Sequence, residues 1–117
     1  MTSISPWLSV TDTARALVYY SAAYGADVIE RLEGDDGVVE VAHLDVDGAD
    51  FWVQRDPSSV PGESIRLILS VDDPDAVFAR AIEAGATELS PVAEGNGWRV
   101  GRLVDPSGHQ WEIGRPL

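Results

Sequence analysis

The sequence predicts an α+β fold made of two similar halves. Each half reads as one strand, one helix and three further strands, because apolar residues alternate in the strand segments and recur every three to four residues in the helical ones. A spacing of 60 residues relates the halves, since Gly25 corresponds to Gly85 and Gly48 to Gly108. Such repetition indicates one structural unit used twice. We therefore expect two βαβββ modules that form a curved, mixed, eight-stranded sheet.

The first half predicts a helix between its first two strands. Asp12 is a suitable N-cap residue, and Gly25 stands where a helix commonly ends. The residues that recur at helical spacing between them are Ala14, Leu17, Val18 and Ser21. The predicted strands are 4–10, 27–34, 38–48 and 49–54.

The second half repeats this order. Its helix, 72–85, begins at a capping acid, has Pro74 in its first turn and stops at Gly85. The segment "DPSG" (105–108) has proline second and glycine fourth, which is typical of a type I turn. The predicted strands are 65–71, 86–92, 98–104 and 109–114.

The length of 117 residues favours one domain, 1–117. We expect a first module over 1–55, a polar linker with two prolines over 56–63, and a second module over 64–117. A module of that size would be marginally stable alone. The two modules are therefore expected to fold together.

Composition excludes several classes of function. The net charge is −12, with 20 acidic and 8 basic residues, which argues against nucleic acid or an anionic membrane as a partner. Cysteine is absent, which excludes disulfides and thiolate metal sites. We see no secretion signal and no membrane span, and expect a cytoplasmic protein. The acidity favours solubility, or alternatively the attraction of a cationic ligand.

Alternation along the strands divides the side chains between two faces of the sheet. The strictly apolar positions should face the helices, and the other face carries tryptophans with a few polar groups. If the sheet curls, that face lines a ligand site of the usual composition; the alternative is a solvated sheet face. The predicted ligand-binding residues on it are Ser5, Trp7, His43, Trp52, Gln54, Arg66 and Glu112, with Trp98 at a rim of undetermined face.

The segments "WLSVTDTARALVYYSAAYGADV", "DDPDAVFARAIEAGAT" and "VGRLVDPSGHQWEI" resemble the vicinal oxygen chelate superfamily of glyoxalase, bleomycin resistance and extradiol dioxygenase proteins. The last segment is close to the superfamily ending DP-x-G-x-x-x-E. Within the superfamily, the residue pattern is most similar to the PhnB-like or uncharacterised glyoxalase-like branch. The resemblance covers essentially the whole chain and implies paired βαβββ modules, a ligand cup in the sheet and, commonly, a homodimer.

Metal-dependent members of this superfamily use one side chain from the first strand and one from the last strand of each module. The matching positions here are Ser5, Trp52, Arg66 and Glu112. Only Glu112 suits a metal, because tryptophan has no ligand atom and arginine stays cationic. We therefore expect no metal cofactor. The alternative is a divalent metal ion held by Glu112 with His43.

Four further side-chain roles are expected. Arg66 and Glu112 should form an ion pair; alternatively they are separated and solvated. His109 should be a structural residue of the turn or strand start, and Trp111 a core residue. The three tyrosines, Tyr19, Tyr20 and Tyr24, should serve helix packing or dimer contacts rather than catalysis.

Two functions remain open at this point. The first is a metal-free binding protein that holds a planar or amphipathic small molecule and sequesters a drug or natural product. The second is a glyoxalase-type lyase or isomerase, or a dioxygenase, with a nonstandard metal site or acid–base work by Glu112 or His43.

Overall fold

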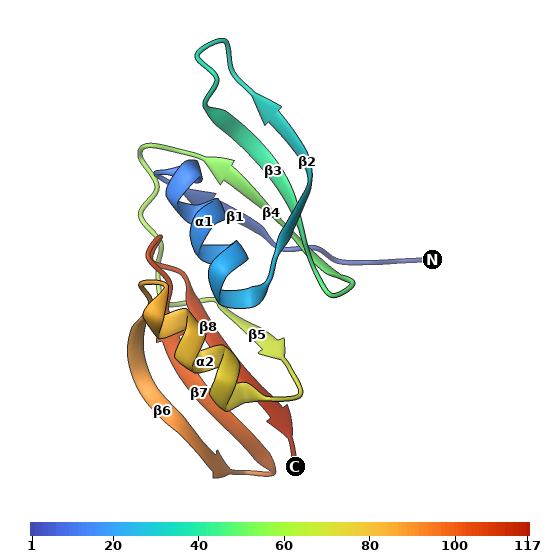
Figure 1. The fold of residues 1–117 in the computed structure, drawn as a ribbon, viewed down its shortest axis with the longest axis vertical. Coiled ribbons are helices and arrows are strands. Elements are labelled where there is room, and N and C mark those ends of the chain that lie inside the picture. The colour runs from blue at the N-terminus through green and yellow to red at the C-terminus, as the bar shows by residue number, and fades with distance from the viewer.

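The computed structural model describes residues 1–117 and contains two βαβββ units in the predicted order (Figure 1). The first module contains β1 (Trp7–Val10), α1 (Thr13–Tyr24), β2 (Asp27–Glu33), β3 (Val39–Val46) and β4 (Ala49–Arg55). The second contains β5 (Arg66–Ser70), α2 (Pro74–Glu83), β6 (Thr87–Gly95), β7 (Trp98–Val104) and β8 (Gln110–Pro116). The α+β class is therefore confirmed.

The eight strands divide into two mixed four-stranded sheets rather than one continuous sheet. The strand orders are β1-β4-β3-β2 and β5-β8-β7-β6. In each sheet the first strand of the module pairs in parallel with the last, and the remaining pairs are antiparallel. The modules meet through side chains, not through a backbone ladder, and this explains why the sheet is interrupted. Neither helix is long and apolar enough to cross a membrane.

Helix α1 has the predicted ends, but the side that it buries is not the side on which the sequence placed the residues at helical spacing. The Asp12 side chain accepts a hydrogen bond from the Arg15 amide at 3.0 Å, and Gly25 ends the helix in the left-handed conformation with φ of 70°. Val18, which belongs to the spacing that predicted the helix, is 70% exposed. The buried residues of α1 are Thr13, Ala16, Tyr19, Tyr20, Ala23 and Tyr24. The aromatic rings face the sheets because they bury the largest apolar area.

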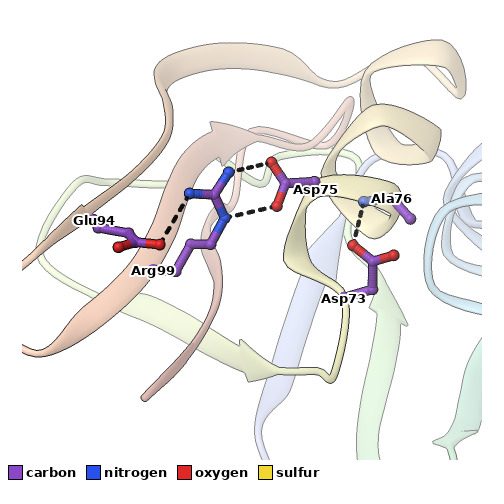
Figure 2. A network of polar contacts seen from close by, with 5 residues as sticks. All are labelled: Asp73, Asp75, Ala76, Glu94 and Arg99. Atoms are coloured by element: carbon purple, nitrogen blue, oxygen red, sulfur yellow. Dashed lines mark hydrogen bonds and ion pairs between the residues drawn. The ribbon is translucent and has the colours of Figure 1, made fainter. Parts of the chain in front are cut away.

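Helix α2 is fixed to its sheet by an arginine (Figure 2). Arg99 on β7 donates two hydrogen bonds to the Asp75 carboxylate, at 2.7 and 2.6 Å, and also contacts Glu94 at 3.4 Å. These hydrogen bonds lower the pKa of Asp75 and raise that of Arg99. Asp73 caps the helix by accepting from the Ala76 amide at 3.1 Å. The start of α2 is thereby anchored over β7.

The two modules share one hydrophobic core. A single cluster of 19 buried residues draws on both. At its centre the Trp111 ring of the second module lies 4.8 Å from Tyr24 and 5.6 Å from Phe51 of the first, measured between ring centroids. Trp111 is therefore a core residue, as predicted, and the tyrosines pack the helix.

Asp105 is the one buried charged side chain, and it joins the modules. Its carboxylate accepts hydrogen bonds from the Tyr20 hydroxyl on α1 and from the Trp111 indole at 2.9 Å. It also accepts the backbone amides of Ser107 and His109, at 2.9 and 3.0 Å. Four donors therefore meet one carboxylate, which satisfies the buried charge.

The predicted turn after β7 is confirmed and makes a second link between the modules. The Gly108 amide donates to the Asp105 carbonyl at 2.9 Å, which closes the turn. The His109 Nε2 atom lies 2.8 Å from the Ser9 carbonyl oxygen in the first module. Because a carbonyl only accepts, Nε2 is the donor. The expected structural role of His109 is confirmed.

Candidate functional site

The face of each sheet that lies away from its helix, the open face, carries the predicted site residues. In β4 the side chains of Phe51 and Val53 are buried toward the helix, whereas Trp52 between them is only half-buried. The same alternation holds in β1, where Leu8 and Val10 are buried. The predicted assignment of faces is therefore confirmed for these strands.

Three aromatic rings stack in a row on the open face of the first module. Trp52 stands opposite His43 on β3 and opposite Trp7 on β1 in the strand register. The His43 and Trp52 rings are 3.9 Å apart between centroids and nearly parallel, at 2°. The Trp7 and Trp52 rings are 5.8 Å apart at 19°. We call these three residues the aromatic stack.

Polar neighbours hold the aromatic stack in place. The Asp50 carboxylate lies 2.7 Å from His43 Nε2 and accepts the Ser5 hydroxyl at 2.8 Å. The Trp7 indole donates to the Gln54 side chain at 2.6 Å. The hydrogen bonds with His43 and Ser5 lower the pKa of Asp50.

Asp50 was not among the predicted site residues. The alternation that places Trp52 and Gln54 on the open face places Asp50 there too, so this signal was available in the sequence. Its partner His43 must donate from Nε2 to an ionised carboxylate, and Nδ1 of that ring has no protein partner.

The aromatic stack ends at a hollow. Trp7 is 52% exposed, and it lines a hollow of about 270 Å³ between β1, the 56–63 linker and the start of β8. The other residues that line it are Pro6, Leu8, Pro61, Gly62, Ser64, Ile65, Leu67, His109 and Gln110. A planar molecule placed there would have an indole ring beside it.

The open face of the second module carries a charged cluster instead of the aromatic stack. Arg66 Nη1 lies 3.7 Å from Glu112 Oε1, so the predicted ion pair is confirmed. Arg102 on β7 stands opposite Glu112 in the register, and its Nε lies 3.9 Å from the same oxygen. Arg102 also donates to the Gln110 side chain at 3.2 Å. The Arg66, Arg102 and Glu112 side chains are called the arginine cluster below.

Trp98 lies on this same open face. It lines a hollow of about 240 Å³ together with Ile68, Val100 and Glu112. The sequence left the face of Trp98 undetermined. Gly101 and Leu103 of β7 are buried toward α2, so the alternation of side chains places Trp98 on the opposite face of the sheet.

The predicted site residues fall into two groups within the chain. No hydrogen bond, ion pair or aromatic contact connects the two groups. The first group is Ser5, Trp7, His43, Trp52 and Gln54; the second is Arg66, Trp98 and Glu112. The chain therefore has two separate open faces, one on each module, where the sequence predicted a single cup.

The residues at the superfamily's metal positions do not fit a metal ion. Trp52 is engaged in the aromatic stack and offers no ligand atom. Arg66 places a permanent positive charge beside Glu112, the one suitable ligand. The other candidate, His43, lies on the other module and directs Nε2 to Asp50. No group of three or more histidine, aspartate or glutamate side chains comes together to hold a metal.

The chain belongs to the glyoxalase-like domain family, whose family model matches residues 7–114. The match and the solved structures that share the fold confirm the resemblance to the vicinal oxygen chelate superfamily. An uncharacterised protein of Mycobacterium tuberculosis is 34% identical in an alignment that covers 98% of this chain and 75% of that protein.

Two solved structures are similar along their whole length. TioX from Micromonospora sp. ML1 is 28% identical, with a TM-score of 0.80 and complete coverage of both chains. TnmS3 from Streptomyces sp. CB03234, described as an antibiotic binding protein, is 25% identical with a TM-score of 0.71, over 99% of this chain and 98% of that one.

Proposed function

We propose that this protein is a metal-free binding protein that holds a planar small molecule against the aromatic stack. The observation that carries the proposal is the row of parallel rings of Trp7, Trp52 and His43, of which Trp7 is half-exposed beside a hollow. Exposed, pre-ordered aromatic rings offer a large contact area at little cost in conformational entropy.

The charge around the aromatic stack favours a neutral or cationic ligand. Asp50 keeps its negative charge because hydrogen bonds lower its pKa, and the chain carries a net charge of −12. A ring with a positive charge would gain cation–π contacts with the indoles and attraction to the carboxylates. The antibiotic binding neighbour TnmS3 supports a role in sequestering a drug or natural product in the cytoplasm.

Equilibrium dialysis with proflavine, a planar cationic aromatic probe, tests this proposal. We expect saturable binding that weakens by about threefold to tenfold in Trp7→Ala and Trp52→Ala, as the loss of an aromatic contact implies. Leu89→Ala, which removes an exposed apolar side chain from β6, is the matched control and should bind as the unmodified protein does. Equal binding in all variants would remove the aromatic stack from the site.

A metal-free acid–base enzyme is the second candidate function. The observation that favours it is the orientation of His43, whose Nε2 is held by Asp50 while Nδ1 is left without a protein partner. A base positioned in this way is suited to removing a proton next to a carbonyl group. Deuterium exchange from D₂O into small α-hydroxyketones, measured with the protein and with His43→Gln, decides the matter. Exchange that His43→Gln abolishes would support the enzyme, and no exchange above buffer would sink it.

We also propose that the chain forms a homodimer that covers part of the open faces. Ile68 and Trp7 leave 60% and 52% of their surfaces exposed there, which is costly for large apolar side chains. Sedimentation equilibrium should give twice the chain mass of 12.6 kDa. A mass equal to that of one chain at micromolar concentration would contradict the dimer.

A further inference from the structure

The arginine cluster has more hydrogen-bond donors than the chain satisfies. Both contacts to Glu112, at 3.7 and 3.9 Å, are too long to be hydrogen bonds. Arg102 Nε is buried and has no hydrogen-bond partner at all. A buried N–H group without an acceptor costs free energy unless a ligand or solvent satisfies it. The cluster therefore has free donors for an acceptor that comes from outside.

The charge of the cluster is opposite to that of the chain. Two guanidinium groups surround one carboxylate, so the local charge is positive although the chain carries −12. Arg66 is 46% exposed and reachable from solvent. The other residue bonded to the cluster, Gln110, is neutral. An anion meets net attraction here, whereas a cation would meet two permanent positive charges.

An apolar hollow adjoins the cluster. Glu112, which both arginines flank, is also one of the four residues that line the hollow of about 240 Å³. The other three are Ile68, Trp98 and Val100, so the rest of the lining is apolar and includes an indole. This volume is below the roughly 300 Å³ at which drug-sized sites begin, and suits a group the size of one ring.

We infer that the open face of the second module is a subsite for the carboxylate of a small aromatic acid. The arginines bind the carboxylate, since planar guanidinium donors match its two oxygens. The ring of the acid packs on Trp98, Ile68 and Val100. Glu112 keeps the two guanidinium groups beside the hollow, because both lie near its Oε1 atom. This subsite lies on a different module from the aromatic stack, goes beyond the proposed function and does not depend on it.

Benzoate is the probe that tests this subsite, with the neutral isostere benzamide beside it. Titration is followed by ¹H–¹⁵N NMR at the Trp98 indole and Arg102 Nε–H signals. We expect both signals to shift with benzoate and saturate, and benzamide to bind roughly tenfold more weakly because it lacks the charge. Binding should weaken as salt is raised.

The variants Arg102→Gln and Arg66→Gln should each weaken benzoate binding about tenfold or more. Arg66 is half-exposed, so its replacement leaves folding intact even if that of Arg102 does not. Arg115→Gln is the matched control: Arg115 lies on β8, the strand that carries Glu112, is exposed and lines no part of the hollow, and its loss changes the net charge equally. Benzoate affinity should be unchanged in it.

Three results would overturn the inference, and the first two are no saturable shift with benzoate and equal losses in Arg66→Gln and Arg115→Gln. Equal affinity for benzoate and benzamide would also overturn it, because the charge would then play no part. Trp52→Ala separates this subsite from the proposed function. It should weaken proflavine binding and leave benzoate binding unchanged, so that either proposal can fail alone.

Discussion

Trp52 and Glu112 occupy the same place in the two modules, but the residue that faces each on the neighbouring strand is different, and this gives them different chemistry. His43 faces Trp52 on the neighbouring strand, and Arg102 faces Glu112. The first pair is a parallel ring stack, and the second is an ion pair. One repeated position in the fold thus supports an aromatic surface in one module and a charged surface in the other.

The three tyrosines should not ionise in the folded protein near pH 10. Burial raises the pKa of Tyr19, Tyr20 and Tyr24 above the ordinary value. Because the folded-state pKa is raised, the contribution of each phenol to the free energy of unfolding is fully present below the unfolded-state pKa of about 10. Above that pH the contribution is lost by up to about 1.4 kcal/mol per pH unit for each phenol. Phenolate absorbance should therefore appear together with loss of the far-ultraviolet circular dichroism. Titration of any tyrosine near pH 10 with the fold intact would contradict the buried cluster.

Asp105→Ala should destabilise the protein by roughly 3 kcal/mol or more, because the Tyr20 hydroxyl and the Trp111 indole lose their acceptor inside the core. The repeat supplies a matched control. Asp45 holds the corresponding place in the first module, but its carboxylate accepts only an exposed Gly48 amide at 3.3 Å. Asp45→Ala should cost about 0.5 kcal/mol or less. Urea unfolding measures both, and equal losses would refute the role given to Asp105.

Asp50→Asn should loosen the aromatic stack. The carboxylate holds His43 and Ser5, and its lowered pKa means that this stabilisation is present above about pH 4 and lost as the pH falls through the folded-state value. Near-ultraviolet circular dichroism should report a weakened tryptophan signal in the variant at neutral pH and in the unmodified protein only in acid. Asp47→Asn, in the adjacent turn, is the control. An unchanged signal in Asp50→Asn would show that the stack does not need this anchor.

Protein purified without chelator should contain no stoichiometric zinc, nickel, iron or manganese. The reason is the positive charge of Arg66 beside Glu112 and the absence of any group of three side chains that could hold a metal ion. Elemental analysis of the purified protein measures this. One metal ion per chain would refute both the metal-free proposal and the assignment of Arg66 as an ion-pair partner.

The repeat and the alternation of side chains were enough to predict the element order, the helix ends and the open faces. These features depend on local spacing, which the sequence carries directly. The division into two sheets did not follow, because the contact between modules depends on how Tyr20 packs against Asp105 and Trp111, and Tyr20 lies 85 residues from Asp105 in the chain.

Arg102 was missed for a related reason. Arg102 pairs with Glu112, and His43 pairs with Trp52, the residue that corresponds to Glu112 in the first module. His43 is therefore the counterpart of Arg102, but it lies 59 rather than 60 residues away. The connections between these paired strands differ in length, because Val46 pairs with Ala49 in the first module whereas Val104 pairs with Gln110 in the second, so the repeat does not keep one spacing throughout. A constant offset cannot find such a residue, whereas tracing cross-strand neighbours can.

The shared core bears on how the two halves can change over evolutionary time. Substitutions at Trp111, Phe51 or Tyr24 are felt by both halves at once, so the interior of the duplicated unit evolves under joint constraint. The open faces lie outside that core and are not subject to this joint constraint. A substitution on the open face of one half therefore needs no compensating change in the other, and Trp52 and Glu112 show that one repeated position can carry an aromatic ring in one half and a carboxylate in the other.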